Sequence, residues 1–313
     1  MQIDRIGATS FQNQNSFHDT VPTGATSAGL TFDPRIAQDW AAPQTFAPRA
    51  FSDTGAVAAP SEKSDVSNLD EARTHVALSA DVYNDTPNPP DGWRVAGQDD
   101  LDRLRLTPDL LERSDASFRA RVYVSDEGGE TRYVVAFRGS ATGEDWINNG
   151  QQAIGASSEH YDKALRIGQR LAAVGADVTL TGHSLGGGLA SAAALASGHE
   201  ADTFNAAGLH SSTIDAARSG GRATPHIDAF YMRGDPLSTL QDGGDRAILG
   251  GLGAILFGAP GAILGGVFGD AAPAVGDRIP ITPTPPEGQS WRDVGPGALH
   301  GVEWFQSSLG AAR

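Results

Sequence analysis

The sequence predicts an α/β fold in which a mostly parallel central sheet is covered by helices on both faces. Two observations support this prediction. Between residues 159 and 232, helix-like segments alternate with short strand-like runs, a pattern typical of βαβ units. At residues 182–186, a glycine-rich turn joins a β-branched run directly to an alanine-rich segment. The chain has 313 residues, enough for a sizeable core, although its apolar fraction of 39 % indicates that part of it lies outside that core.

The first 64 residues lack the periodicity of a helix or a strand. They are rich in Thr, Ser, Ala, Gly, Gln and Pro, so we expect a flexible leader over residues 1–64 and a folded domain over residues 65–313. Residues 1–16 contain no apolar run that could form the core of a signal peptide. We therefore expect no classical cleavable export signal. A cytoplasmic protein fits this observation, and so does a bacterial protein that is cytoplasmic until a dedicated secretion machine exports it.

The folded part is predicted to begin near Asp65, with a helix capped by Ser67 and ended by the turn-rich residues 84–92. Its apolar side chains follow steps of three and four residues. They are Leu69, Ala72, Val76, Ala80 and Tyr83. A short helix over residues 101–112 follows. Two strands, over residues 118–124 and 133–137, are then joined as a hairpin by the turn at residues 126–129.

Beyond the hairpin, helices and strands alternate without an internal repeat. The expected helices span residues 159–173, 185–197 and 212–218, and the expected strands span residues 178–181, 202–206 and 227–232. Strands separated by helices at this spacing pair in parallel. Side chains that follow such strands gather at the carboxyl edge of the sheet, where binding and catalytic groups of α/β folds lie.

Charge and cysteine content exclude several classes of protein. The formal net charge is −15, which disfavours nucleic acid as a partner, because a phosphate backbone requires a basic surface. The same charge repels anionic membranes, so any contact with lipid should be local and apolar. The chain has no cysteine, which excludes disulfides, thiolate nucleophiles and cysteine-ligated zinc. No metal or other cofactor is indicated.

A serine nucleophile is predicted at residue 184. Gly182-His183-Ser184-Leu185-Gly186 lies between a strand and a helix, the context that a G-x-S-x-G nucleophile elbow of an α/β-hydrolase requires. The turn is too tight for side chains two residues before and after the serine, and the helix that follows points its free N–H groups toward developing negative charge. The alternative is an ordinary strand–turn–helix. His183 is interpreted as structural, because the elbow directs it away from the line of attack.

A histidine base and a carboxylate are required, because a serine hydroxyl is too weakly acidic to attack an ester unaided. In α/β-hydrolases the chain order is serine, acid, histidine. Four histidines follow Ser184, namely His199, His210, His226 and His300. Asp235 comes directly after a predicted strand, and only His300 follows it. We therefore assign Asp235 as the acid and His300 as the base, with Asp270 and Asp277 as alternatives for the acid.

The oxyanion of the intermediate needs two hydrogen-bond donors, one of which is normally the N–H of the residue after the nucleophile, here Leu185. Residues 135–146, V-A-F-R-G-S-A-T-G-E-D-W, followed by Ile147 and Asn149, form a strand that enters a loop of small residues. Together with the elbow and Gly234-Asp235-Pro236, this run resembles the class 3 lipase family and its phospholipase A1 members, including bacterial effector lipases. The resemblance extends over about residues 71–305.

The resemblance implies that Ser140 supplies the second oxyanion donor and that Ser184, Asp235 and His300 form a catalytic triad. Trp146 would pack near the site, although a core position is an equally good interpretation. The chain departs from the family before the nucleophile strand. There the family has His-x-Gly-Phe and this chain has Glu159-His160-Tyr161, so His160 is given no role.

An apolar, glycine-rich insert separates Asp235 from His300. Residues 247–269 contain no charged side chain and are as long as a membrane span, but many glycines and Pro260 disfavour a stable free helix. One interpretation is a pair of short core helices. The other is a flap beside the site that enters lipid. In the second case the side chains expected to contact acyl chains are Ile255, Leu256, Phe257 and Phe268.

These observations favour a lipolytic serine hydrolase that cleaves carboxylic esters of phospholipids through an acyl-serine intermediate. The resemblance suggests a bacterial phospholipase A1-type effector delivered into other cells, with unidentified delivery and immunity proteins. A soluble carboxylesterase or acyltransferase is one alternative. A membrane-inserting toxin with a hydrolase-like carrier fold is another. A calcium site at Asp242 and Asp245 is left open, with a plain turn as its alternative.

Overall fold

The computed structural model describes residues 62–112, 118–139, 150–241, 274–294 and 297–310. For residues 62–68, 150–158, 240 and 293, the description is limited to the backbone. The chain divides into two units, Met1–Ala58 and Ala59–Arg313. All described residues belong to the second unit. Residues 1–61 of the expected leader and the insert at residues 247–269 lie outside the described residues, whereas residues 62–64 belong to the first helix of the folded part.

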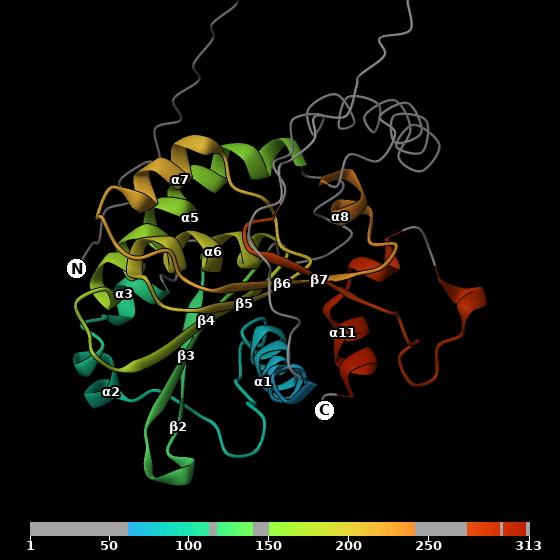
Figure 1. The fold of residues 1–313 in the computed structure, drawn as a ribbon, viewed down its shortest axis with the longest axis horizontal. Coiled ribbons are helices and arrows are strands. Elements are labelled where there is room, and N and C mark those ends of the chain that lie inside the picture. Colours follow the sequence, from blue (N-terminus) through green and yellow to red (C-terminus); the bar gives the residue numbers. More distant parts are fainter. Residues whose placement is uncertain (1–61, 113–117, 140–149, 242–273, 295–296, 311–313) are drawn as a thin grey trace, which may run out of the picture. The chain divides into compact units, whose positions relative to one another are not determined.

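A seven-stranded sheet forms the centre of this unit, and its strands lie side by side in chain order (Figure 1). The strands are β1 Arg94–Val95, β2 Ala120–Ser125, β3 Arg132–Phe137, β4 Asp177–His183, β5 Ala201–Phe204, β6 Ile227–Met232 and β7 Asp277–Ile281. The first three pair antiparallel, and β3 to β7 pair in parallel. The predicted mostly parallel sheet is therefore confirmed, with β1 and β7 added to it.

Helices cover both faces of the sheet (Figure 1). They are α1 Glu62–Asp81, α2 Gln98–Arg103, α3 Pro108–Leu111, α5 Gly150–Leu171, α6 Leu185–Ser197, α7 Ser211–Arg218, α8 Pro236–Gln241 and α11 Val302–Leu309. Right-handed crossovers that all step in one direction place their helices on a single face. This explains why α5, α6 and α7 lie together, while α1 and α11 pack on the opposite face. The predicted α/β-hydrolase fold is confirmed.

Small residues let α6 lie close to its neighbours. Every residue of α6 after Leu185 is buried, and most are glycine or alanine. At Gly168 in α5, an added Cβ would lie 2.4 Å from the Ala193 carbonyl oxygen of α6, closer than any real contact. A larger side chain at this crossing would push α6, and with it the turn at Ser184, away from the sheet.

Large aromatic side chains hold α11 against the opposite face. Trp304 and Phe305 are fully buried and pack with Phe204 of β5 and Phe230 of β6. Burial of each of these side chains contributes about 1.5–3 kcal/mol. Because α11 begins two residues after His300, this packing also fixes the turn that carries His300.

Three predicted helices differ clearly from those observed. Helix α5 spans Gly150–Leu171 rather than the predicted residues 159–173. Helix α1 begins at Glu62 rather than at a Ser67 cap, because the residues before Ser67 include Glu62 and Lys63, which are good helix formers. The single helix predicted over residues 101–112 is wrong: it is divided into α2 and α3. Pro108 explains the division, since proline disfavours helical backbone in the residue before it and is well suited to the first turn of a new helix.

Candidate active site

Ser184 occupies a strained turn between β4 and α6. Its φ and ψ angles are 59° and −126°, a conformation that side chains rarely adopt and that is typical of functional turns. The flanking glycines are required by close contacts. A Cβ added at Gly182 would lie 2.3 Å from the Gly186 carbonyl oxygen, and a Cβ added at Gly186 would lie 2.1 Å from the Phe137 carbonyl oxygen. The predicted elbow therefore has a steric basis at both glycines.

The structure brings Ser184, His300 and Asp235 together. His300 Nε2 lies 2.9 Å from Ser184 Oγ, and His300 Nδ1 lies 2.7 Å from Asp235 Oδ1. All three residues are buried, with Asp235 fully enclosed. In the neutral ring Nδ1–H donates to the carboxylate, which leaves Nε2 to accept the serine proton. This arrangement can deprotonate a serine hydroxyl.

Asp235 is held by the first turn of α8. Its Oδ2 accepts a hydrogen bond from the Ser238 backbone N–H at 2.7 Å, while its own backbone N–H donates to Met232 at the end of β6. One carboxylate oxygen is thereby fixed by the backbone and the other faces His300. The placement of the acid after β6 follows the rule that such groups gather at the carboxyl edge of the sheet.

Asn205 anchors the loop that carries His300. Its side-chain Oδ1 accepts from the Met232 N–H at 2.8 Å, and its Nδ2 donates to the carbonyls of Leu299 at 3.1 Å and His300 at 3.3 Å. The residue is fully buried and has a positive φ of 43°. The sequence analysis missed this residue, although an asparagine directly after a parallel strand is a signal that could have identified it.

His183 packs against His300 instead of standing apart from it. The two ring centroids are 5.0 Å apart, and His183 Nε2 donates to the His300 carbonyl oxygen at 2.6 Å. Burial, together with a smaller contribution from the neighbouring His300, lowers the pKa of His183 to about 3. His183 is therefore neutral at physiological pH and adds no positive charge beside His300.

Tyr83 extends the contacts of His183 toward β3. Its hydroxyl lies 3.4 Å from His183 Nδ1 and accepts from the Gly139 backbone N–H at 3.0 Å. Burial raises the pKa of Tyr83 to about 12, so the hydroxyl stays protonated. The sequence analysis placed Tyr83 on the apolar stripe of a helix, but it lies two residues beyond the end of α1.

Leu185 is the first residue of α6. The first N–H groups of a helix have no intrahelical acceptor and carry the positive end of its dipole. The Leu185 N–H is thus available to an oxyanion beside Ser184. The other oxyanion residue, Ser140, and the expected lipid contacts Trp146, Ile255, Leu256, Phe257 and Phe268 lie outside the described residues, as do Asp242, Asp245 and Asp270.

The remaining candidates lie away from Ser184. Asp277 begins β7 and Asp228 lies near the start of β6. Both residues are therefore at the opposite edge of the parallel sheet from Ser184, and the prediction of Asp277 as an alternative acid is wrong. His226 lies beside them, 3.1 Å from Asp228 through Nε2 and 3.9 Å from Asp277 through Nδ1. Because the two carboxylates face different ring nitrogens, this cluster fits ion pairing better than a shared metal ion.

His199 and His210 make local contacts. His199 Nε2 donates to the Leu171 carbonyl oxygen at 3.2 Å, and His210 Nδ1 accepts from the N–H of Ser212 in α7. Neither contact involves Ser184. Among the four histidines that follow Ser184, His300 is the one in hydrogen-bond contact with its hydroxyl.

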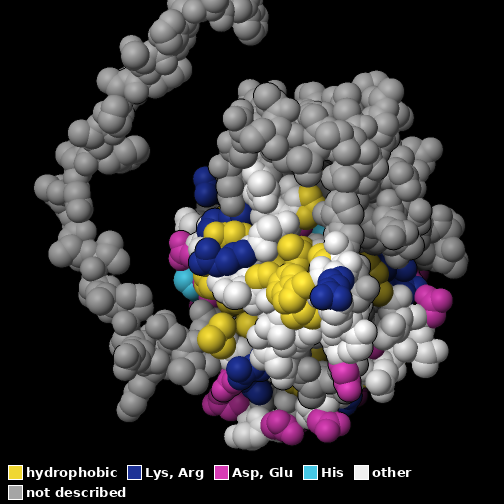
Figure 2. Space-filling view, turned by 90° about the vertical axis from the view of Figure 1, so that its right-hand side faces the viewer, with side chains coloured by type: hydrophobic (Ala, Val, Ile, Leu, Met, Phe, Trp, Pro, Cys, Tyr) yellow, Lys and Arg dark blue, Asp and Glu magenta, His cyan; other side chains and the backbone are white. Residues whose placement is uncertain are grey.

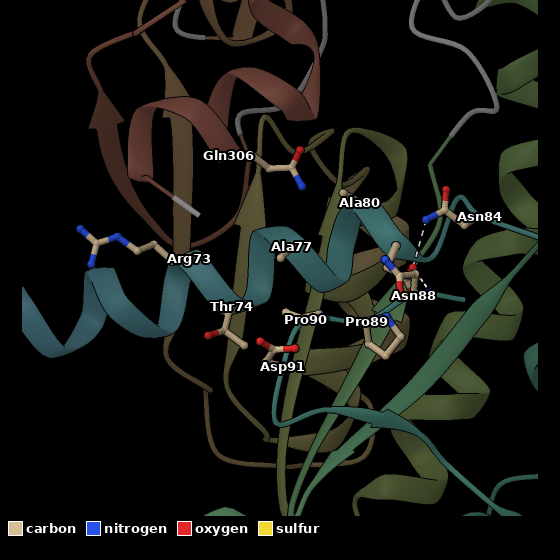
Figure 3. A pocket seen from close by; sticks show the side chains of 11 residues that line it. Arg73, Thr74, Ala77, Ala80, Asn84, Asn88, Pro89, Pro90, Asp91 and Gln306 are labelled. Carbon is tan, nitrogen blue, oxygen red and sulfur yellow. Dashed lines mark hydrogen bonds between the residues drawn. The ribbon is translucent and has the colours of Figure 1, made fainter. Parts of the chain in front are cut away.

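A groove of about 620 Å³ lies beside α1 (Figure 3). It is bordered by α1 from Arg73 to Asp81, by residues 84–91 and by Gln306 of α11. The buried Asp81 on its wall accepts hydrogen bonds from Tyr123, Asn84 and the Asn88 N–H. The groove does not include Ser184, Asp235 or His300. Within the part of the chain that the structure describes, no helix has the length and apolar character needed to cross a bilayer.

Comparison with known proteins gives matches to a family model, to a characterised relative and to solved structures. A family model for the Tle-like phospholipase domain, described as phospholipase-like, matches residues 74–286, a range that contains Ser184 and Asp235 and ends before His300. The extracellular phospholipase A1 of Serratia liquefaciens is 36 % identical over 139 residues, which are 44 % of this chain and 42 % of that protein. This chain thus aligns with less than half the length of that relative. The solved Rhizomucor miehei lipase propeptide complex matches at 19 % identity over 56 % of this chain and 64 % of that chain, with a TM-score of 0.36.

Proposed function

This chain belongs to the family of Tle-like phospholipase domains, and from that premise we propose that it hydrolyses a carboxylic ester bond of a phospholipid. Its relative from Serratia is described as a phospholipase A1, which favours attack on a fatty acyl ester of a glycerophospholipid. The observation that carries the proposal is a buried series of hydrogen bonds. It runs from Ser184 Oγ, directly after β4, through His300 to Asp235, which follows β6. No cofactor enters the proposed reaction.

In the proposed first step, Ser184 Oγ attacks the ester carbonyl carbon while its proton passes to His300 Nε2. Asp235 holds the ring in the required tautomer and stabilises the imidazolium that forms. Collapse of the tetrahedral intermediate breaks the bond to the alcohol, which takes the proton from Nε2 and leaves as the lysophospholipid. Water, deprotonated by the same nitrogen, then attacks the acyl-serine. The bond from the acyl carbon to Ser184 Oγ breaks, the fatty acid leaves, and Nε2 returns its proton to Ser184 Oγ.

The proposed oxyanion site includes the Leu185 N–H at the start of α6. This N–H is fixed by the helix before the reaction begins, and such preorganised donors contribute about 2.7–4 kcal/mol each to transition-state stabilisation. The prediction that Ser140 supplies the second donor remains part of the proposal. Gly139, the residue before it, is held in place by the Tyr83 hydroxyl.

Part of the described surface is suited to lipid contact, although the net charge of the chain is −15. On the face shown in Figure 2, hydrophobic side chains form a central group beside Lys and Arg side chains, and Asp and Glu side chains lie mainly toward its lower edge. Among the described residues, the large hydrophobic side chain with the greatest exposure is Trp291, at 57 %. Its ring packs on Trp304, and tryptophan is favoured at membrane interfaces. We retain the apolar segment 247–269 as a proposed second lipid contact.

The test is to incubate the full chain and the Ser184→Ala variant with a phospholipid that carries a different acyl chain at each position. Mass spectrometry of the products should show one released fatty acid and one lysophospholipid with the wild type and neither with the variant. Release of the phosphorylated head group instead would contradict the proposal. Turnover of a short soluble ester without turnover of dispersed phospholipid would identify a soluble esterase.

The same vesicles distinguish a second class of function. If the chain were a membrane-inserting toxin, Ser184→Ala would release an encapsulated dye as fast as the wild type. The proposed enzyme should release dye only as ester hydrolysis proceeds. The Serratia relative is described as extracellular, and we propose that this chain is likewise exported and acts on membranes of other cells.

A further inference from the structure

We propose that Tyr83 and His183 are positioning residues, which fix the positions of His300 and of the Gly139 backbone relative to Ser184. The inference rests on the proposed function, because it assigns a role within that reaction. It arises from a continuous series of hydrogen bonds that runs from Gly139 through the Tyr83 hydroxyl and the His183 ring to the His300 carbonyl oxygen.

The direction of each hydrogen bond follows from its partners. The His300 carbonyl oxygen can only accept, so His183 Nε2 carries a proton and donates at 2.6 Å. The neutral ring then presents Nδ1 as an acceptor, and the Tyr83 hydroxyl donates to it at 3.4 Å. The same hydroxyl accepts from the Gly139 N–H at 3.0 Å. Each group in the series therefore has a single compatible role.

The series joins the ends of four elements around the site. Gly139 follows β3, Tyr83 follows α1, His183 ends β4, and His300 ends a short 3-10 turn at residues 298–300. Space at Gly139 is fully used, because an added Cβ would lie 2.5 Å from the Tyr83 hydroxyl and 2.7 Å from the His183 carbonyl oxygen. A shift in the Tyr83–His183 pair would consequently displace both the Gly139 backbone and His300.

His183 acts on His300 through the backbone and not through the reacting ring atoms. The His300 side chain uses Nε2 toward Ser184 and Nδ1 toward Asp235, while its carbonyl oxygen is fixed by His183 and by Asn205. Two donors on one carbonyl limit rotation of the His300 peptide. This constraint keeps Nε2 within reach of the serine hydroxyl during both proton transfers.

The test compares His183→Gln with His183→Leu. Glutamine places an amide N–H close to the position of Nε2 and can still donate to the His300 carbonyl oxygen, whereas leucine cannot. On a short soluble ester, His183→Leu should lower kcat by roughly 100-fold with little change in KM, the effect expected when a catalytic group is displaced by about 1 Å. His183→Gln should recover most of that loss. Equal kcat values for the two variants would overturn the proposal.

Matched controls separate positioning from loss of stability. His199→Leu removes another imidazole that donates to a backbone carbonyl, that of Leu171. Tyr83→Phe is paired with Tyr123→Phe, which removes a buried hydroxyl that donates to Asp81. The Tyr83 variant should lower kcat, and both control variants should leave it unchanged. If His183→Leu does not fold, the tyrosine pair decides, and equal kcat values for Tyr83→Phe and Tyr123→Phe would then overturn the proposal.

A measurement without turnover separates this proposal from the proposed function. The proton shared by His300 Nδ1 and Asp235 gives a downfield resonance in the proton NMR spectrum. It should be retained in His183→Gln and broadened or lost in His183→Leu. An inactive wild type would refute the proposed function, whereas an unchanged resonance in His183→Leu would refute the positioning role alone.

Discussion

Replacement of Asn205 by alanine should cost a large share of the stability of the chain. The buried Met232 N–H loses its acceptor and the Leu299 carbonyl loses its donor, while the His300 carbonyl keeps His183. An unsatisfied buried group costs about 1–3 kcal/mol. Alanine at a φ of 43° adds about 1 kcal/mol, because asparagine tolerates left-handed backbone better. Because the Leu299 carbonyl is only partly buried, the loss of its donor should cost no more than about 1 kcal/mol. We therefore expect a total loss of about 3–5 kcal/mol, compared with a typical domain stability of about 5–15 kcal/mol.

The assay is urea unfolding followed by tryptophan fluorescence, with the free energy extrapolated to water. Ser191→Ala is the matched control, since Ser191 is equally buried but donates to Gly187 within its own helix, so its loss should cost no more than about 1 kcal/mol. An Asn205→Ala cost as small as that of the control would refute the reasoning. Where the variant folds, its kcat should fall as well, because the His300 loop loses an anchor.

Three further predictions concern the site and the elbow. Asp235→Asn should lower kcat on a soluble ester by about 10⁴-fold, because the amide favours the wrong imidazole tautomer; an unchanged kcat would exclude Asp235 as the orienting acid. The folded-state pKa of His183 is about 3, below its ordinary value of 6.5, because the folded state favours the neutral ring. The folding stability that this preference contributes is complete above pH 6.5 and is lost as pH falls toward 3. Urea unfolding of His183→Gln should therefore depend less on pH over this range, and parallel curves for variant and wild type would contradict the assignment. Gly182→Ala should destabilise the chain by at least about 1–3 kcal/mol in urea unfolding, because the new methyl group would contact Gly186. Gly175→Ala places its methyl group in open space and should stay within about 0.5 kcal/mol of the wild type in the same assay.

Local patterns predicted much of the fold. The helix at residues 185–197 and the strand at residues 227–232 have the predicted bounds. Alanine and leucine favour a helix in the first, and isoleucine and aromatic residues favour a strand in the second. The elbow could also be located, since its glycines are required by contacts within a few residues. By contrast, β1 has two residues and is exposed, so its sequence carries no recognisable pattern.

The positions of Tyr83 and Asn205 depend on tertiary neighbours. Tyr83 continues the apolar spacing of α1, but its hydroxyl meets groups from β3 and β4 that are far away in sequence. The backbone contacts of His183 with His300 were missed for the same reason, although the sequence analysis did assign His183 a structural role. Sequence order indicated Ser184, Asp235 and His300 as partners, whereas the distances between them required the folded chain.

The packing of α1 against α11 has a consequence for synthesis. A nascent chain on the ribosome presents α1 early, yet the face that α1 shares with Trp304 and Phe305 stays open until α11 has left the exit tunnel. His300 arrives with that same segment. Translation therefore delivers the imidazole at nearly the same moment as it completes the domain, and an unfinished chain carries a serine with no base.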